Sequence, residues 1–120
     1  MHDRIFEIAA QTLSPAEDER PLLDTLCHAA EAELTMRLRD DISPEDCGNV
    51  YVLAAVQVAA AEMMLLRSVS SVEQFTAGEV SIRQSAEKTG TAAALLRRQA
   101  NRLMAPFRKD DGFAFAGVDG

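Results

Sequence analysis

The side chains able to do metal or nucleophilic chemistry are few in this sequence. The two histidines are His2 and His28, and the two cysteines are Cys27 and Cys47. Cys27 and His28 are adjacent, and neighbouring residues on a helix point about 100° apart, so together they do not form a metal half-site. No second pair of ligands has suitable spacing. We therefore expect Cys27 to pack in the core, His28 to lie at the surface, and no metal to be bound.

Catalytic motifs are also missing from the sequence. It has no G-x-S-x-G, no P-loop and no dinucleotide fingerprint. The acidic runs 17–19 and 40–41 could bind Mg²⁺, but such runs are usually solvated loops. Glu62 lies in an apolar segment, where we expect it either to lie on a thin exposed strip or to pair with a base such as Arg67 or Arg97. The sequence thus predicts neither an enzyme nor a cofactor.

Composition favours one soluble helical domain over residues 1–120. Of the 120 residues, 48% are hydrophobic and 5% aromatic, which suits helices packed through Ala and Leu. The charged residues Asp3, Arg4 and Glu7 exclude a signal peptide from the first positions, so we expect a cytosolic, reducing environment. The apolar segment 50–66 contains Gln57 and Glu62, and we expect a buried helix there instead of a membrane span.

Hydrophobic periodicity predicts an all-α bundle of about four helices. The expected spans are 3–13, 21–39, 43–68 and 85–105, with 14–20 as a connector that has room for one helical turn. The third helix is apolar on nearly all sides, which is typical of a central helix. The core of the second follows a four-residue spacing, and two further residues widen the apolar stripe: Leu22, Leu26, Ala30, Leu34 and Leu38, with Leu23 and Cys27. Six leucines are expected to be buried: Leu26, Leu34, Leu53, Leu65, Leu96 and Leu103.

Two segments place apolar residues outside these helices. Strand-forming residues at about 72–84, including Phe75, Val80 and Ile82, predict a short β-hairpin or an extended arm between the last two long helices. The tail at about 110–120 holds Phe113 and Phe115 among small residues, and we expect it to be flexible. Both segments could fold back on the bundle, or they could dock on a partner, since exposed apolar strands seldom stay unpaired.

Charge is unevenly distributed along the chain. The net charge is −7, and residues 1–60 hold twelve acidic and four basic residues, whereas 61–120 hold seven and eight. An acidic chain is a poor candidate for gripping nucleic acid. The main basic group is Arg97, Arg98, Arg102, Arg108 and Lys109. This group could be a solvated face, a salt-bridge surface for the acidic half of another subunit, or a contact to DNA phosphate. The difference in charge between the two halves of the chain favours contact with another subunit over contact with DNA.

The order of these parts resembles a known group of proteins. It comprises acidic helices, a Ser-Pro-Glu-Asp start at 43–46, an Ala-rich helix, the segment QFTAGEVSI at 74–82, Leu-Leu-Arg-Arg at 95–98, and KDDGF at 109–113. Over nearly the whole chain this resembles the small helical head–tail connector, or neck adaptor, proteins of tailed bacteriophages and prophages.

The resemblance implies a structural role in the virion. Such adaptors form a ring under the portal and complete the capsid exit after DNA packaging, so the implied partners are copies of the same chain, the portal, and a tail or stopper protein. Double-stranded DNA would pass through an acidic lumen without specific binding. The expected locations are the virion and, during assembly, the host cytoplasm, with no membrane. Another phage assembly factor, such as a tail-completion protein, and a helical protein-binding regulatory module are the alternatives. The expected interface residues are Phe75, Val80, Ile82, Arg97, Arg98, Arg102, Phe113 and Phe115.

Overall fold

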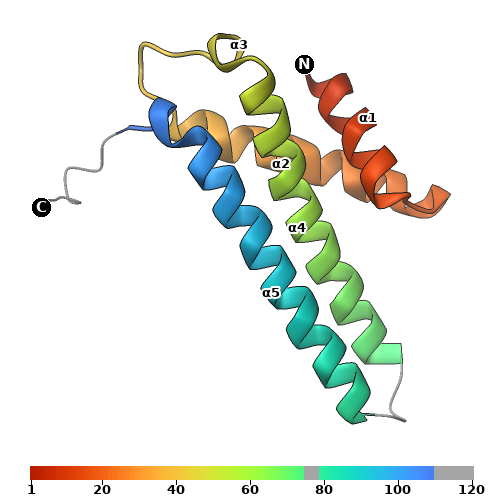
Figure 1. Ribbon diagram of the computed structural model, residues 1–120. Coiled ribbons are helices and arrows are strands. Elements are labelled where there is room, and N and C mark those ends of the chain that lie inside the picture. The colour runs from red at the N-terminus through yellow and green to blue at the C-terminus, as the bar shows by residue number, and fades with distance from the viewer. Residues whose placement is uncertain (75–78, 110–120) are drawn as a thin grey trace, which may run out of the picture.

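Helices make up nearly all of the described chain in the computed structural model (Figure 1). The structure describes residues 1–74 and 79–109, and for 70–74 and 79–87 it describes the backbone alone. The elements are α1 (His2–Leu13), the 3-10 turn η1 (Glu17–Glu19), α2 (Arg20–Arg37), α3 (Pro44–Cys47), α4 (Asn49–Gln74), α5 (Glu79–Met104) and the 3-10 turn η2 (Ala105–Phe107). The predicted all-α class is confirmed, and η1 supplies the single turn allowed for in the connector.

The predicted β-hairpin is wrong for the residues that the structure describes. Residues 72–74 are the last residues of α4, and 79–84 belong to the start of α5. The prediction relied on strand-forming side chains, but their preference amounts to less than about 1 kcal/mol per residue, and extending two long helices that pack on each other outweighs it. Phe75 falls within 75–78, which lie outside the described residues.

Helices α4 and α5 run antiparallel, side by side, and pack on each other more extensively than any other elements (Figure 1). We call them the α4–α5 pair. Helices α1, α2 and α3 pack against α4, which therefore has the central position that its apolar sequence predicted. The carboxyl-terminal half of α4 and the facing part of α5 project beyond α1 and α2.

Gly48 divides the helix that was predicted over 43–68. Pro44 opens the single turn of α3 as expected, and the Asp46 carboxylate accepts hydrogen bonds from the backbone N–H and hydroxyl of Ser43, at 2.9 and 3.1 Å. At Gly48 the backbone takes φ +60° and ψ −133°, a conformation that glycine adopts far more readily than other residues. Helix α4 then begins at Asn49 and runs six residues beyond the predicted end.

The buried face of α2 is one part of the wider apolar stripe that was predicted. Leu23, Cys27, Ala30 and Leu34 are buried, whereas Leu22 is exposed. A strict four-residue spacing drifts about 40° around the helix at each step, so it cannot follow one straight face. The spacing of four, three and four residues in the observed set keeps to that face.

Two of the six leucines that were expected in the core are exposed. Leu53 is 47% and Leu65 37% exposed, whereas Leu34 is buried and Leu26, Leu96 and Leu103 are partly buried. Leu53 lies on a strip of α4 that its neighbouring helices leave uncovered. Leu65 follows Met63, which is the last buried residue of α4 among those described. An apolar composition on all sides of α4 therefore does not mean burial on all sides.

Alanine makes up much of the contact surface of α4. Ala54, Ala55, Ala59 and Ala61 are fully buried, and small side chains allow neighbouring helices to approach closely. The segment Asn49–Val69 is long and apolar enough to cross a membrane, judged by length and composition alone. However, 56% of its most apolar stretch is buried inside the fold. This burial agrees with the expected core helix.

The chain that follows α5 is tied to the end of α2. The Arg39 N–H donates to the Phe107 carbonyl at 3.0 Å, and the Lys109 N–H donates to the Arg37 carbonyl at 2.8 Å. These two bonds flank an antiparallel bridge between Leu38 and Arg108. The bridge fixes the carboxyl-terminal end of α5 beside the end of α2.

Candidate functional site

The predicted interface residues divide into three groups in the structure. Arg97, Arg98 and Arg102 lie on α5 with described side chains. Val80 and Ile82 lie near the start of α5, where only the backbone is described. Three others lie outside the described residues: Phe75, Phe113 and Phe115. The arginines are therefore the predicted residues whose surroundings the structure describes.

Arg97 forms ion pairs within its own chain. Its guanidinium Nη2 lies 2.8 Å from Oε2 of Glu33 on α2, and its Nη1 lies 3.2 Å from Oε2 of Glu62 on α4. Both alternatives expected for Glu62 apply in part, because it pairs with Arg97 and its side chain is 45% exposed. Arg67, the other candidate, pairs with Glu19, with Nη2 3.0 Å from Oε1. Arg97 thus binds α2 and α4 to α5.

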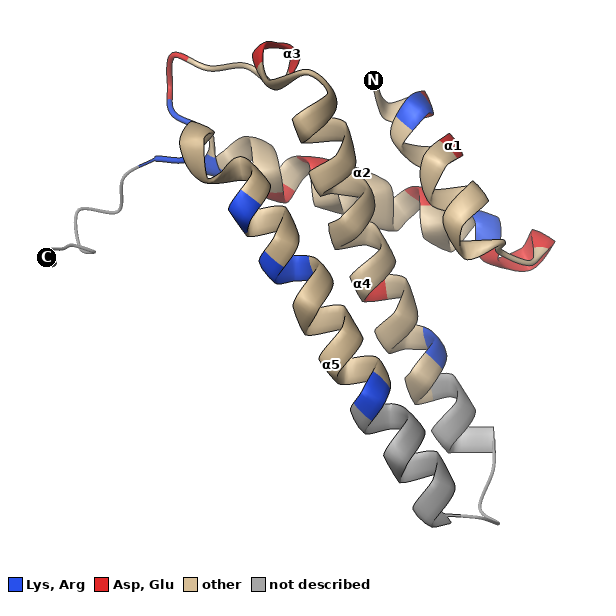
Figure 2. Cartoon of the chain, in the orientation of Figure 1, with Lys and Arg blue, Asp and Glu red and all other residues tan. Residues whose placement is uncertain are grey.

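Arg98 and Arg102 are exposed on α5, and within the described part of the chain neither forms an ion pair. Figure 2 shows the basic residues spaced along α5, whereas acidic residues predominate on α1, η1, α2 and α3. The two halves of the sequence with opposite charge balance therefore occupy different parts of the surface. This leaves two arginines able to meet carboxylates of another molecule.

Large exposed apolar side chains gather on the α4–α5 pair. Among the residues with described side chains, five of the eight lie there: Leu53, Leu65, Leu66, Val69 and Leu95. Single exposed apolar residues are normal, but Leu65, Leu66 and Val69 lie within five residues of one another on α4, and an exposed apolar cluster is typical of a surface that another protein covers. We call these three residues the hairpin leucine surface.

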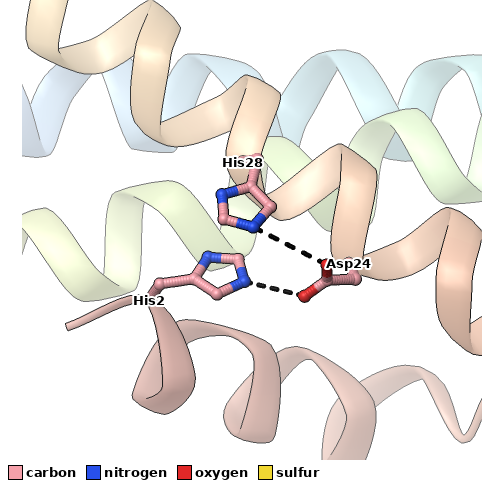
Figure 3. Close-up of side chains that lie close together, drawn as sticks. All are labelled: His2, Asp24 and His28. Carbon is pink, nitrogen blue, oxygen red and sulfur yellow. Dashed lines mark hydrogen bonds and ion pairs between the residues drawn. The ribbon is translucent and has the colours of Figure 1, made fainter.

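A second group of polar side chains lies where α1 meets α2, and sequence reasoning missed it (Figure 3). His2 Nε2 lies 2.7 Å from Oδ1 of Asp24, and His28 Nε2 lies 3.6 Å from Oδ2 of the same carboxylate. His2 Nδ1 contacts Glu31. The two imidazole rings stack, with centroids 3.6 Å apart and planes at 9°. A signal was present in the sequence, since Asp24, His28 and Glu31 are spaced to share one helix face.

The protonation of these groups follows from their contacts. Burial acts to lower the pKa of His2, but its hydrogen bonds to Asp24 and Glu31 outweigh burial and raise that pKa. The same bond to His2 lowers the pKa of Asp24. Cys27, by contrast, is buried in the core as expected, and burial raises the pKa of its thiol to about 11. Cys27 is therefore an unreactive packing residue.

Comparison with known proteins gave no match: no family model, no curated protein and no solved structure is detectably similar to this chain.

Proposed function

We propose that this chain is a structural phage neck protein, a ring-forming adaptor that joins the portal of the filled capsid to the tail. The observation that carries the proposal is the hairpin leucine surface on the projecting α4–α5 pair. Burying Leu65, Leu66 and Val69 against a neighbouring subunit would remove apolar area from water, at about 25 cal/mol per Å².

The charge distribution supports subunit contacts of a particular kind. Arg97 is already paired within its own chain, so the predicted salt-bridge role between subunits falls to Arg98 and Arg102. They would face the acidic part of the next copy, in a heterologous contact that can close into a ring. The net charge of −7 would leave the ring acidic, and DNA could slide through it without binding.

The sequence resemblance supplies the biological setting. The segment at 74–82 and the order of helices resemble those of neck adaptors, whose partners are the portal and a tail or stopper protein. On this proposal the chain works in the virion and assembles in the host cytoplasm. Phe75, Val80, Ile82, Phe113 and Phe115 are proposed as further contact residues.

The test is assembly on the portal of the same phage or prophage, followed by mass photometry and negative-stain electron microscopy. We expect the unmodified chain to add a ring to the portal. The variant Leu65→Asn/Leu66→Asn should retain its helix content but lose ring formation. The matched control is Met36→Asn, which changes a side chain that is 76% exposed on α2 and is not part of the hairpin leucine surface, and this variant should assemble normally.

Two results would contradict the proposal. In the first, the unmodified chain stays monomeric with the portal. In the second, rings form equally well from the Leu65→Asn/Leu66→Asn variant. Specific binding to a host regulatory protein, with no effect of portal, would instead favour the protein-binding module.

A further inference from the structure

Three potential metal ligands from two helices converge at the α1–α2 contact. Figure 3 shows the imidazoles of His2 and His28 both facing the Asp24 carboxylate. One ligand atom from each of the three residues lies within 4.8 Å of the other two. Asp24 and His28 are one turn apart on α2, so the helix backbone fixes their separation, and His2 comes from the first turn of α1.

The spacing is close to that of a first-row transition-metal site. With metal–ligand bonds of about 2.1 Å, a tetrahedral zinc site has ligand atoms about 3.4 Å apart. Nε2 of His2 lies 2.7 Å from Oδ1 of Asp24 and Nε2 of His28 lies 3.6 Å from Oδ2, so the ligand atoms are near this spacing, and the imidazoles must turn toward a single carboxylate oxygen to complete the site. Two imidazole nitrogens and one carboxylate oxygen suit Zn²⁺ better than Ca²⁺ or Mg²⁺, which prefer oxygen alone.

A further carboxylate holds one ligand in orientation. Glu31 contacts Nδ1 of His2, which leaves Nε2 of that ring directed at Asp24. Metal-bound histidines typically donate their second ring N–H to a carboxylate in this way. The buried Tyr51 on α4 donates its hydroxyl hydrogen to the main-chain carbonyl of Glu31 at 2.9 Å, which ties this turn of α2 to α4. The cluster thus has both ligands and a supporting residue.

We propose that His2, Asp24 and His28 bind a divalent transition-metal ion, with Zn²⁺ as the leading candidate, and that the ion fastens α1 to α2. Nε2 of each imidazole and one Asp24 oxygen are the ligands, with water in the remaining position. The ion displaces the hydrogen on Nε2 of His2, which leaves as a proton to water, and the stacked rings turn edge-on to the ion. His28 has room to turn because its side chain is 61% exposed, and the Asp24 side chain is 48% exposed to solvent.

Zinc titration by isothermal calorimetry is the test, on a chain without a polyhistidine tag. We expect one Zn²⁺ per chain. His28→Gln and Asp24→Asn should each weaken binding at least about tenfold, and Glu31→Gln by about tenfold, as for other supporting carboxylates. The matched control is Asp18→Asn, which removes one exposed carboxylate from η1 and should bind zinc as the unmodified chain does.

Nuclear magnetic resonance provides a readout at the ligands themselves. The chain has only two histidines, so both sets of imidazole signals can be followed during zinc addition. Both should shift together and reach an end point at one equivalent. A single shifting ring, no zinc binding, or affinity unchanged by His28→Gln would overturn the proposal. Circular dichroism with EDTA present establishes that each variant is folded, and ring assembly is not part of the readout, so the result is independent of the proposed function.

Discussion

Nη2 of Arg97 lies 2.8 Å from Oε2 of Glu33, which binds α5 directly to α2 although α5 packs mainly on α4. The same guanidinium reaches Glu62, so one side chain joins three helices. Replacing Arg97 with Met should lower the free energy of unfolding by about 1 kcal/mol, because a partly exposed ion-pair network is worth little more than that. Urea unfolding measures the change. Arg98→Met, one residue along α5 and exposed, is the control and should change stability by less than about 0.5 kcal/mol.

Neighbouring leucines on α2 should differ sharply in their contribution to stability. Leu23 is fully buried and Leu22 is 41% exposed. Leu23→Ala should cost about 2–5 kcal/mol through lost burial and the cavity left behind, whereas Leu22→Ala should cost less than about 1 kcal/mol. Urea melts of the two single variants give the comparison. Equal losses at both positions would show that the buried face of α2 is assigned wrongly.

Glycine-to-alanine substitutions should have opposite effects at two positions. Gly48 has φ +60°, so Gly48→Ala should destabilise the fold by about 1–2 kcal/mol through backbone strain, even though no atom would contact the new methyl group. Gly90 lies inside α5, where an added Cβ also meets open space. Gly90→Ala should stabilise by about 0.5–1 kcal/mol. Thermal melts measure both effects, and two shifts of the same sign would contradict this account.

Acid should destabilise the fold in part through two carboxylates. The hydrogen bond from Arg67 lowers the pKa of Glu19. The pKa of Asp46 is lowered mainly by the hydrogen bond from the backbone N–H of Ser43, and also by the bond from the Ser43 hydroxyl. Because their pKa values are lower in the folded chain than in the unfolded chain, both groups stabilise the fold fully above about pH 5 and lose that contribution as the pH falls through the folded values. We expect the urea midpoint to fall between about pH 5 and about pH 3. The fall should be smaller in Glu19→Gln than in the unmodified chain, and an identical pH dependence would rule out this contribution.

The helices could be predicted from the sequence, but the faces they bury were harder to predict. Periodicity and Pro44 located the main helices, since these signals are local. The uncovered strip at Leu53 depends on where α1, α2 and α5 lie around α4, which no local pattern encodes. The break at Gly48 was missed because an isolated glycine is compatible with a helix as well as with a turn. The strand preference of Val80 and Ile82 was weaker than the pull of helix packing.

Predicting the polar cluster required knowing which helices touch. Asp24 and His28 share a face of α2, but His2 reaches them only because α1 folds back beside α2. The sequence places His28 next to Cys27, but Cys27 is buried in the core and faces away from the side of α2 that His28 occupies. The pairing of Arg97 with Glu62 was predictable, since a carboxylate in an apolar helix needs a base close by.

The bridge between Leu38 and Arg108 has a mechanical consequence for anything attached beyond Lys109. Its two flanking main-chain hydrogen bonds join the chain after α5 to the end of α2. We therefore expect a pull on the carboxyl-terminal side of Lys109 to reach α2 as well as α5, at the end of the α4–α5 pair opposite its projecting part.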